Sequence, residues 1–134
     1  MSKLVPLPPP ATCRRLEVAD EDLLAIDRQV LARMAFLLYL VRDFENQVLE
    51  FKDADLVHGP AHTSVGQEAV AAAVAAALRT TDLIGSTHRA HGHFLAKAVM
   101  YYAPAGYDPT VEPVTGPIQS AVNRTLAEIM GLRE

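Results

Sequence analysis

The sequence has one cysteine, no tryptophan and few aromatic residues, which make up 6% of its 134 residues. Because Cys13 has no second cysteine to pair with, an internal disulfide is impossible. Positive charge is also scarce, since 12 lysines and arginines stand against 16 aspartates and glutamates and give a formal net charge of -4. A chain without a basic surface does not neutralise a phosphate backbone. We therefore expect no nucleic-acid partner.

Long hydrophobic runs are missing as well. The most apolar region, residues 23–41, is interrupted by Asp27, Arg28 and Arg33, and its longest unbroken part is MAFLLYLV. A membrane-spanning helix needs about 20 apolar residues. The N-terminus also lacks the charged start, apolar centre and small-residue cleavage site of a signal peptide. These absences predict a cytoplasmic protein that does not enter a membrane.

The chain nevertheless has the material for one domain, because half of its residues are hydrophobic. Four prolines fall between Pro6 and Pro10, and such a run is incompatible with a helix interior. We therefore predict a proline-rich arm or linker at residues 1–19 and a helical part at residues 20–134. Proline and glycine gather again at residues 103–117, which predicts a loop there.

Helical spacing of apolar residues dominates the second part of the chain. It starts with an acidic first turn and continues over residues 20–51, and between residues 34 and 41 the apolar side chains go all round the helix. An alanine-rich helix is predicted next. Ser64 and Gln67 precede it with the spacing of a capping box, so we expect these two side chains and Glu68 to be structural.

A strand and two further helices complete the prediction. Residues 82–86, DLIGS, form a short apolar run bounded by turn residues and predict a strand. Residues 92–102 predict a short helix, and a last helix starts at Pro117 and ends at Gly131. The predicted fold class is mainly α with one short strand. The all-round apolar segment needs covering on several sides, so we also expect self-association.

All five histidines lie between positions 58 and 93, on two bends separated by one predicted helix. A zinc site is one interpretation, although no HExxH or CxxC framework accompanies these histidines, and we expect no metal ligands among them. A second interpretation is that they satisfy backbone groups in turns. Anion binding fits better at Arg89, because a guanidinium and backbone N–H groups before a helix start can together hold a phosphate.

Two blocks of sequence resemble a known family, the alpha subunits of thiamine-diphosphate-dependent 2-oxo acid and acetoin dehydrogenases. HGPAHTSVGQEAVAAAVAAALRTTDLIGSTHRAHGHFLAKAV, residues 58–99, is similar to the family's H-x-x-x-G-Q-E-A helix, its strand and its [Y/H]-R-x-H-G-H turn, in that order. With LVRDFENQVLE before this block and TLAEIMG after it, the resemblance covers most of residues 22–132. It implies the N-terminal segment of an α/β fold that binds thiamine diphosphate.

The resemblance also assigns roles to three residues. It implies that Arg89 contacts the diphosphate of the cofactor, with His88 beside it where many relatives have a tyrosine. His62 matches the active-site histidine that faces the reacting end of the cofactor. A guanidinium suits a diphosphate, and an imidazole can exchange protons near a carbonyl at neutral pH. For His91 and His93 we expect hydrogen bonds within the turn and at the helix start.

The family's Mg²⁺ and diphosphate motif, G-D-G…N, does not occur in these 134 residues, and residues 103–117 form an insertion relative to its usual pattern. The resemblance therefore implies part of a larger subunit, inactive alone. It also implies a beta-type subunit or domain and a lipoyl-bearing acyltransferase as partners. Pyruvate, branched-chain 2-oxo acids and acetoin remain open as substrates, and THRAHGH favours acetoin. The alternative function is a non-catalytic helical module for binding or assembly.

Overall fold

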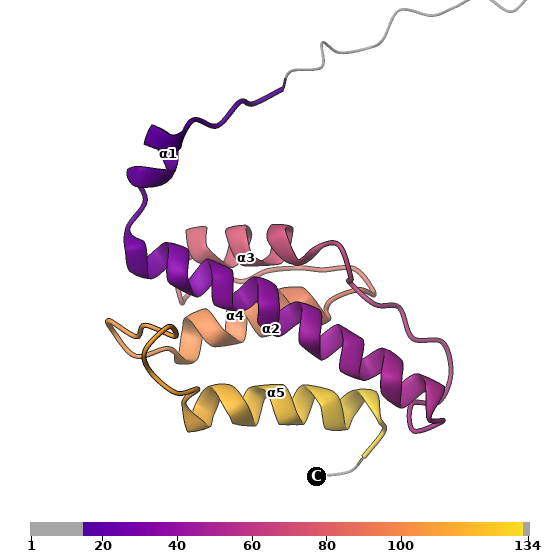
Figure 1. Cartoon of the computed structure of the whole chain (residues 1–134). Helices are drawn as coiled ribbons and strands as arrows, with labels where there is room; N and C mark the ends of the chain where they lie inside the picture. Colours follow the sequence, from indigo (N-terminus) through magenta and orange to yellow (C-terminus); the bar gives the residue numbers. More distant parts are fainter. Residues whose placement is uncertain (1–14, 133–134) are drawn as a thin grey trace, which may run out of the picture.

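The computed structural model describes residues 15–132, which fold into five helices. These are α1 (Asp20–Leu24), α2 (Arg28–Asp53), α3 (Glu68–Ala77), α4 (His91–Tyr102) and α5 (Gly116–Ile129). Figure 1 shows α2 to α5 packed together, with α1 set apart beyond the start of α2. The prediction of a mainly α chain is thus confirmed. Cys13 and the proline cluster of the predicted arm lie outside the described residues.

α2 begins after a break that the apolar spacing does not reveal. The prediction of one continuous helix over residues 20–51 is wrong at residues 25–27, where α1 has ended and α2 has not begun. The side chain of Asp27 accepts hydrogen bonds from the backbone N–H groups of Gln29 (2.8 Å) and Val30 (3.2 Å). An aspartate that satisfies these N–H groups is an N-cap, so it starts a new helix.

The core lies where α2, α3 and α4 meet, and α5 closes it from one side. α3 contributes alanines to this core, and their small side chains let its backbone approach α2 and α4 closely. The all-round apolar segment of α2 is only partly covered: Leu37 and Val41 are buried, whereas Leu38 and Tyr39 stay exposed. The buried apolar side chains form two clusters, Leu37, Ala71, Ala72, Ala75, Ala96, Val99, Tyr107 and Ile118, and Val41, Phe44, Val48 and Leu95.

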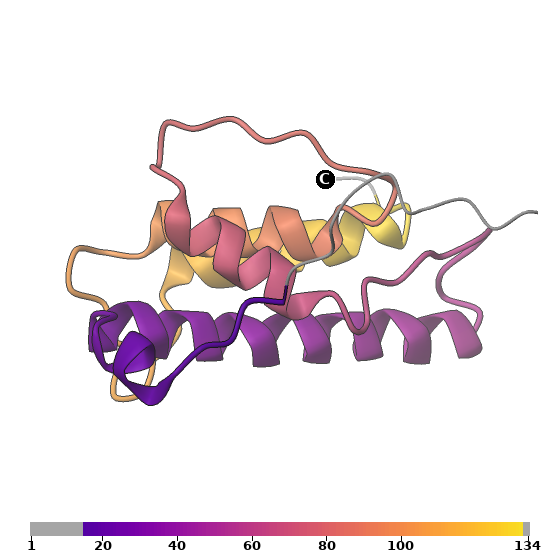
Figure 2. The same ribbon diagram turned by 90° about the horizontal axis from the view of Figure 1, so that it is seen from above.

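The connection between α3 and α4, residues 78–90, is a long open strap (Figure 2). The predicted strand at residues 82–86 is wrong, because no strand occurs anywhere in residues 15–132. A strand needs a neighbour whose backbone accepts and donates its hydrogen bonds, and the strap has none among the described residues. Leu83, the centre of its apolar run, is 97% exposed.

The segment between α4 and α5 contains no helix, and it is anchored by one aromatic side chain. Tyr107 is buried in the core, and its hydroxyl donates a hydrogen bond to the carbonyl oxygen of Pro113 at 3.4 Å. α5 then starts at Gly116 with Pro117 in its first turn, where the missing N–H of proline costs nothing. None of the helices in the described part of the chain has the length and apolar character needed to cross a membrane.

Candidate functional site

The two histidine-bearing bends of the chain meet in the fold. The first bend, residues 58–67, joins α2 to α3, and the second bend, residues 85–90, leads into α4. Figure 2 shows how this meeting arises: the strap carries the chain back along the length of α3, so that α4 begins near the place where α3 begins. Two segments that are separated by a whole helix in the sequence thus become neighbours.

The three predicted site residues lie together at this meeting point. The rings of His62 and His88 have centroids 4.7 Å apart and an interplanar angle of 74°. Arg89 Nη1 donates a hydrogen bond to the carbonyl oxygen of Thr63 at 3.2 Å, which ties the second bend to the first. Both imidazoles are exposed, so they remain accessible to a ligand or a partner.

The guanidinium of Arg89 is suited to an anion. Its side chain is half-buried, and within residues 15–132 it forms no ion pair with a carboxylate. Five N–H groups in a planar fork match the oxygens of a phosphate. The first turn of α4 follows directly, and the N–H groups there have no acceptor within their own helix and carry its positive dipole end. These donors fit a phosphate or diphosphate group.

A buried carboxylate lies behind the two bends. Glu45, in the middle of α2, is 0% exposed, and its Oε1 accepts a hydrogen bond from Ser64 Oγ at 2.6 Å. His91 Nδ1 lies 3.3 Å from Oε1 and 3.4 Å from Oε2. Burial opposes ionisation of this carboxyl, but the hydrogen bonds from His91 and Ser64 outweigh it and hold the pKa of Glu45 below its usual range. The carboxylate is therefore charged at neutral pH.

The prediction for Ser64 and Gln67 is corrected by this arrangement. The hydroxyl of Ser64 is used by Glu45 and does not cap a helix, because α3 starts later, at Glu68. Gln67 is the N-cap residue of α3 but makes no side-chain capping bond, and its N–H donates to the carbonyl oxygen of Ser64 at 2.9 Å. His91 likewise differs from expectation, since its partner is a carboxylate of α2 and not a turn.

Glu68 fixes the start of α3 to α2. Its Oε1 lies 2.6 Å from Arg42 Nε and also accepts the N–H of Gly66 at 2.9 Å. The hydrogen bond from Arg42 lowers the pKa of Glu68 to about 2, against the opposing effect of burial. Glu68 is thus structural, as predicted, but it acts through an ion pair between helices and a bond to the turn before α3.

Gly92 sets how closely α4 approaches the first bend. A Cβ at this position would lie 3.0 Å from Ser64 Oγ and 3.0 Å from Val41 Cγ1. Such distances are shorter than ordinary van der Waals contact, so the glycine lets the side chains of Ser64 and Val41 pack directly against the α4 backbone. The glycine of the THRAHGH motif is therefore required by packing.

The remaining histidines do not join the cluster. His58 is exposed and lies 3.8 Å from Asp55, while His93 Nδ1 lies 2.6 Å from Ser86 Oγ. These short-range contacts resemble the turn and helix-start role expected for His93. Across the described ranges, no group of three or more histidine, cysteine, aspartate or glutamate side chains is arranged to hold a metal ion.

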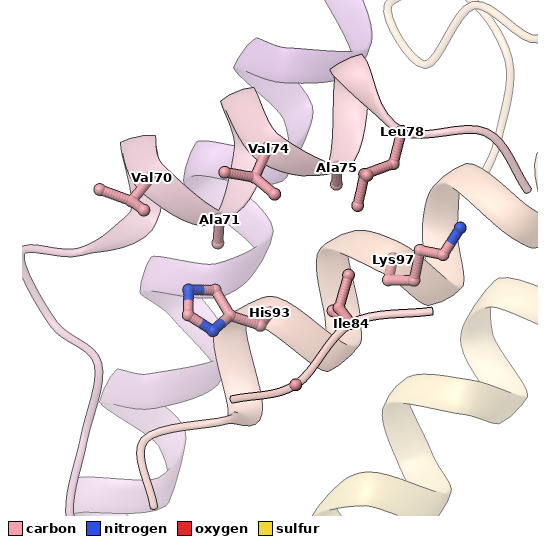
Figure 3. Close-up of a pocket in the computed structure, with 9 residues that line it drawn as sticks. Val70, Ala71, Val74, Ala75, Leu78, Ile84, His93 and Lys97 are labelled. Atoms are coloured by element: carbon pink, nitrogen blue, oxygen red, sulfur yellow. The ribbon is translucent and has the colours of Figure 1, made fainter. Parts of the chain in front are cut away.

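An apolar pocket of about 320 Å³ lies between α3, α4 and the strap (Figure 3). Val74 of α3 and Leu78, just after its end, face His93 and Lys97 of α4 across it, and Ile84 of the strap closes one side. The ammonium of Lys97 is bound to two carbonyl oxygens beyond the end of α3. The pocket is therefore mainly apolar and does not share the anion-binding chemistry of the bends.

Sequence reasoning missed Glu45. The available signal was its spacing: Glu45 follows Val41 by four residues and precedes Val48 by three, so it stands on the apolar face of the helix. A charged residue at a core position requires a buried partner. The two partners, Ser64 and His91, lie too far away in the sequence for local patterns to indicate them.

Comparison with known proteins extends this picture. The chain is 46% identical over 57 residues to the alpha subunit of acetoin:2,6-dichlorophenolindophenol oxidoreductase from Bacillus subtilis (strain 168). This match covers 42% of this chain and 17% of that protein. It is 35% identical over 81 residues to the alpha subunit of the same name from Cupriavidus necator. This match covers 60% of this chain and 24% of that protein. The matched part of the chain thus spans no more than about a quarter of either relative. No solved structure matches the chain significantly.

The family model that matches is that of the dehydrogenase E1 component, over residues 38–104. This range is half of the chain, and it includes both bends, all of α3 and α4, and the buried carboxylate of α2. The chain therefore belongs to the dehydrogenase E1 component family.

Proposed function

We propose that this chain supplies cofactor-binding and active-site groups to a thiamine-diphosphate-dependent dehydrogenase that acts on acetoin or a 2-oxo acid. The observation that carries the proposal is the meeting of the two bends. It places the guanidinium of Arg89 beside two exposed imidazoles, and within residues 15–132 this guanidinium has no carboxylate partner. Family membership supports the same reaction class. The names of both relatives favour acetoin as the substrate.

In this proposal Arg89 and His88 hold the diphosphate of the cofactor. The guanidinium binds phosphate oxygens through its planar fork. The backbone N–H groups at the start of α4 add further hydrogen-bond donors, and these also carry partial positive charge. The exposed His88 ring, in contact with His62, offers a further N–H donor. When bound, thiamine diphosphate supplies a nucleophilic carbon and an electron sink for cleaving the bond next to a substrate carbonyl.

His62 is the proposed catalytic residue of this chain. Its exposed imidazole can donate or accept a proton at a substrate oxygen, since histidine changes its charge near neutral pH. The contact with His88 limits the positions that the ring can take. His62 thus has the freedom to reach substrate and a neighbour that orients it.

The remaining parts of the reaction belong to partners in this proposal. A beta-type subunit or domain completes the cofactor site, Mg²⁺ is bound outside the described residues, and the acyl group passes to a lipoyl-bearing acyltransferase. The 134-residue chain is accordingly expected to be inactive alone and to bind thiamine diphosphate weakly or not at all. Calorimetry on the isolated chain with Mg²⁺ present tests this, and an affinity in the low micromolar range would contradict it.

The proposal predicts different defects for Arg89→Ala and His62→Ala in the active enzyme that contains this chain. Arg89→Ala removes a charge-assisted contact, so cofactor binding should weaken by about 2 to 5 kcal/mol. His62→Ala should lower kcat on the order of 100-fold and leave cofactor affinity nearly unchanged, because a proton donor acts mainly in the transition state. The measurements are cofactor titration and steady-state kinetics.

Matched controls exist for both variants. Arg79→Ala removes an exposed arginine that pairs with Asp82 at the other end of α3, and His58→Ala removes an exposed histidine of the first bend. Both should leave cofactor affinity and turnover close to those of the unmodified enzyme. If the two test variants weaken cofactor binding equally, or behave like their controls, the roles assigned to Arg89 and His62 are wrong.

A further inference from the structure

The buried carboxylate of Glu45 connects both halves of the candidate site through hydrogen bonds. One connection runs through Ser64, which lies two residues after His62 in the first bend, with Ser64 Oγ donating to Glu45 Oε1 at 2.6 Å. This is a short bond to a charged acceptor, and bonds of this kind are about twice as strong as those between neutral groups. The position of the first bend relative to α2 is therefore fixed close to His62.

The other connection runs through His91, which lies two residues after Arg89. His91 Nδ1 is 3.3 Å and 3.4 Å from the two carboxylate oxygens, and the ring also contacts Phe44 edge-on at a centroid distance of 6.2 Å. When the His91 ring is neutral, donation to Glu45 requires the proton on Nδ1 and leaves Nε2 without one. Glu45 thus selects one tautomer and one ring orientation at the start of α4.

The cost of burying Glu45 indicates that it does more than stabilise the fold. An apolar side chain of similar size at such a position is often equally stabilising or better, because an ionised carboxylate loses its hydration. Glu68 shows what a mainly structural carboxylate does in this chain: its hydrogen bonds to Arg42 and to the N–H of Gly66 fix the start of α3. Glu45, in contrast, binds from a single side chain both Ser64 of the first bend and His91, the first residue of α4, which directly follows the second bend.

We propose that Glu45 is a positioning residue of the candidate cofactor site, which holds His62 and Arg89 in register by binding Ser64 on one side and His91 on the other. The effect on cofactor binding rests on the proposed function, whereas the effect on the positions of the two bends concerns this chain alone. Glu45 touches no ligand in this scheme and acts through the two bends. Loss of its charge should let the bends separate while the helices remain packed.

The test compares Glu45→Gln with Glu50→Gln in the 134-residue chain. The first variant keeps the size of the side chain and removes its charge, and the second makes the same change on an exposed position of α2. Nitrogen NMR of the histidine rings at alkaline pH reports the His91 tautomer, and the cross-relaxation between the His62 and His88 rings reports whether the bends meet. Inorganic pyrophosphate serves as the anion probe, and the melting temperature reports the fold.

For Glu45→Gln we expect loss of the dominant Nδ1–H tautomer, a weaker His62–His88 signal, and pyrophosphate affinity lower by about fivefold or more. The melting temperature should fall only slightly, although the ring signals change clearly. Glu50→Gln should match the unmodified chain in every measurement. Wild-type tautomer and ring contact in a folded Glu45→Gln variant would overturn the inference. A melting-temperature loss with unchanged ring signals would do the same, because it would show a purely structural role.

Two further results are informative. If the unmodified chain does not bind pyrophosphate, as expected of a site that partners complete, the ring signals alone decide the role of Glu45. If Glu45→Gln does not fold, Ser64→Ala and His91→Gln each remove one of the two connections. Loss of the His62–His88 contact in either variant supports the inference, and a wild-type contact in both overturns it.

Discussion

At the scale of single residues, the most distinctive groups are two carboxylates that α2 and α3 keep charged. Glu68 pairs with Arg42, and its pKa of about 2 lies well below that of an unfolded glutamate, about 4.3. The pKa of Glu45 is lowered as well. The unfolded chain therefore binds protons at these two carboxylates more readily than the folded chain does, and acid favours unfolding.

This difference predicts the sign of the pH dependence. The stabilisation from Glu68 is fully present above about pH 4.3 and is lost as the pH falls toward 2. In Glu68→Gln we expect a lower free energy of unfolding at neutral pH and a flatter decline between these two values. Urea denaturation at a series of pH values measures both. An unchanged acid profile in Glu68→Gln, with Glu50→Gln as the control, would contradict the prediction.

The residue scale also shows what sequence reasoning can find. His62, His88 and Arg89 were found through motifs, and their roles stay predictions. Their proximity could not be derived, because it depends on how far the strap carries the chain back. Ser64 was misassigned because the capping-box pattern is local, whereas its actual partner, Glu45, is 19 residues away.

At the scale of helices, patterns predicted which segments are helical better than where they begin. The predicted helices correspond to α2–α5, but the apolar spacing passed over the break before Asp27, because a cap changes the backbone without changing hydrophobicity. The strand at residues 82–86 failed for another reason. A short apolar run describes a segment alone, while a strand requires a partner. Fold class is therefore easier to predict than pairing.

The close approach of α4 to its neighbours gives a prediction at this scale. Alanine in place of glycine normally stabilises a helix by up to about 1 kcal/mol. At Gly92 the added Cβ would crowd Ser64 Oγ and Val41 Cγ1 at 3.0 Å, and overpacking of this kind costs about 1 to 3 kcal/mol. We therefore expect Gly92→Ala to destabilise the chain by about 1 kcal/mol, measured by denaturant titration.

The matched control for this variant is Gly116→Ala at the start of α5. A Cβ there meets nothing within 4 Å, and the backbone is not in the left-handed region. Its stability should be unchanged or slightly higher. Equal effects of the two substitutions would mean that crowding at α4 does not limit Gly92.

At the scale of the whole molecule, α1 and α2 leave apolar side chains uncovered. α1 buries no residue, Leu24 is 84% exposed, and Tyr39 on α2 is 72% exposed. Exposed apolar surface favours association. We expect the isolated chain to self-associate at micromolar concentration, measured by light scattering, and to bind an apolar dye. A monodisperse monomer without dye binding would show that this exposed apolar surface does not drive self-association.

The strap has a consequence for the covalent continuity of the site. Among the described residues, the backbone of residues 83–88 makes no hydrogen bond to other backbone groups, and Leu83 is almost fully exposed, so a protease can reach this segment before any helix unfolds. A cut there would place His62 and His88 on separate peptides. The contacts that join the two bends, from Arg89 to Thr63 and from Glu45 to Ser64 and His91, do not pass through residues 83–87. A nicked molecule should therefore stay assembled with its two bends in contact, as two fragments that complement each other.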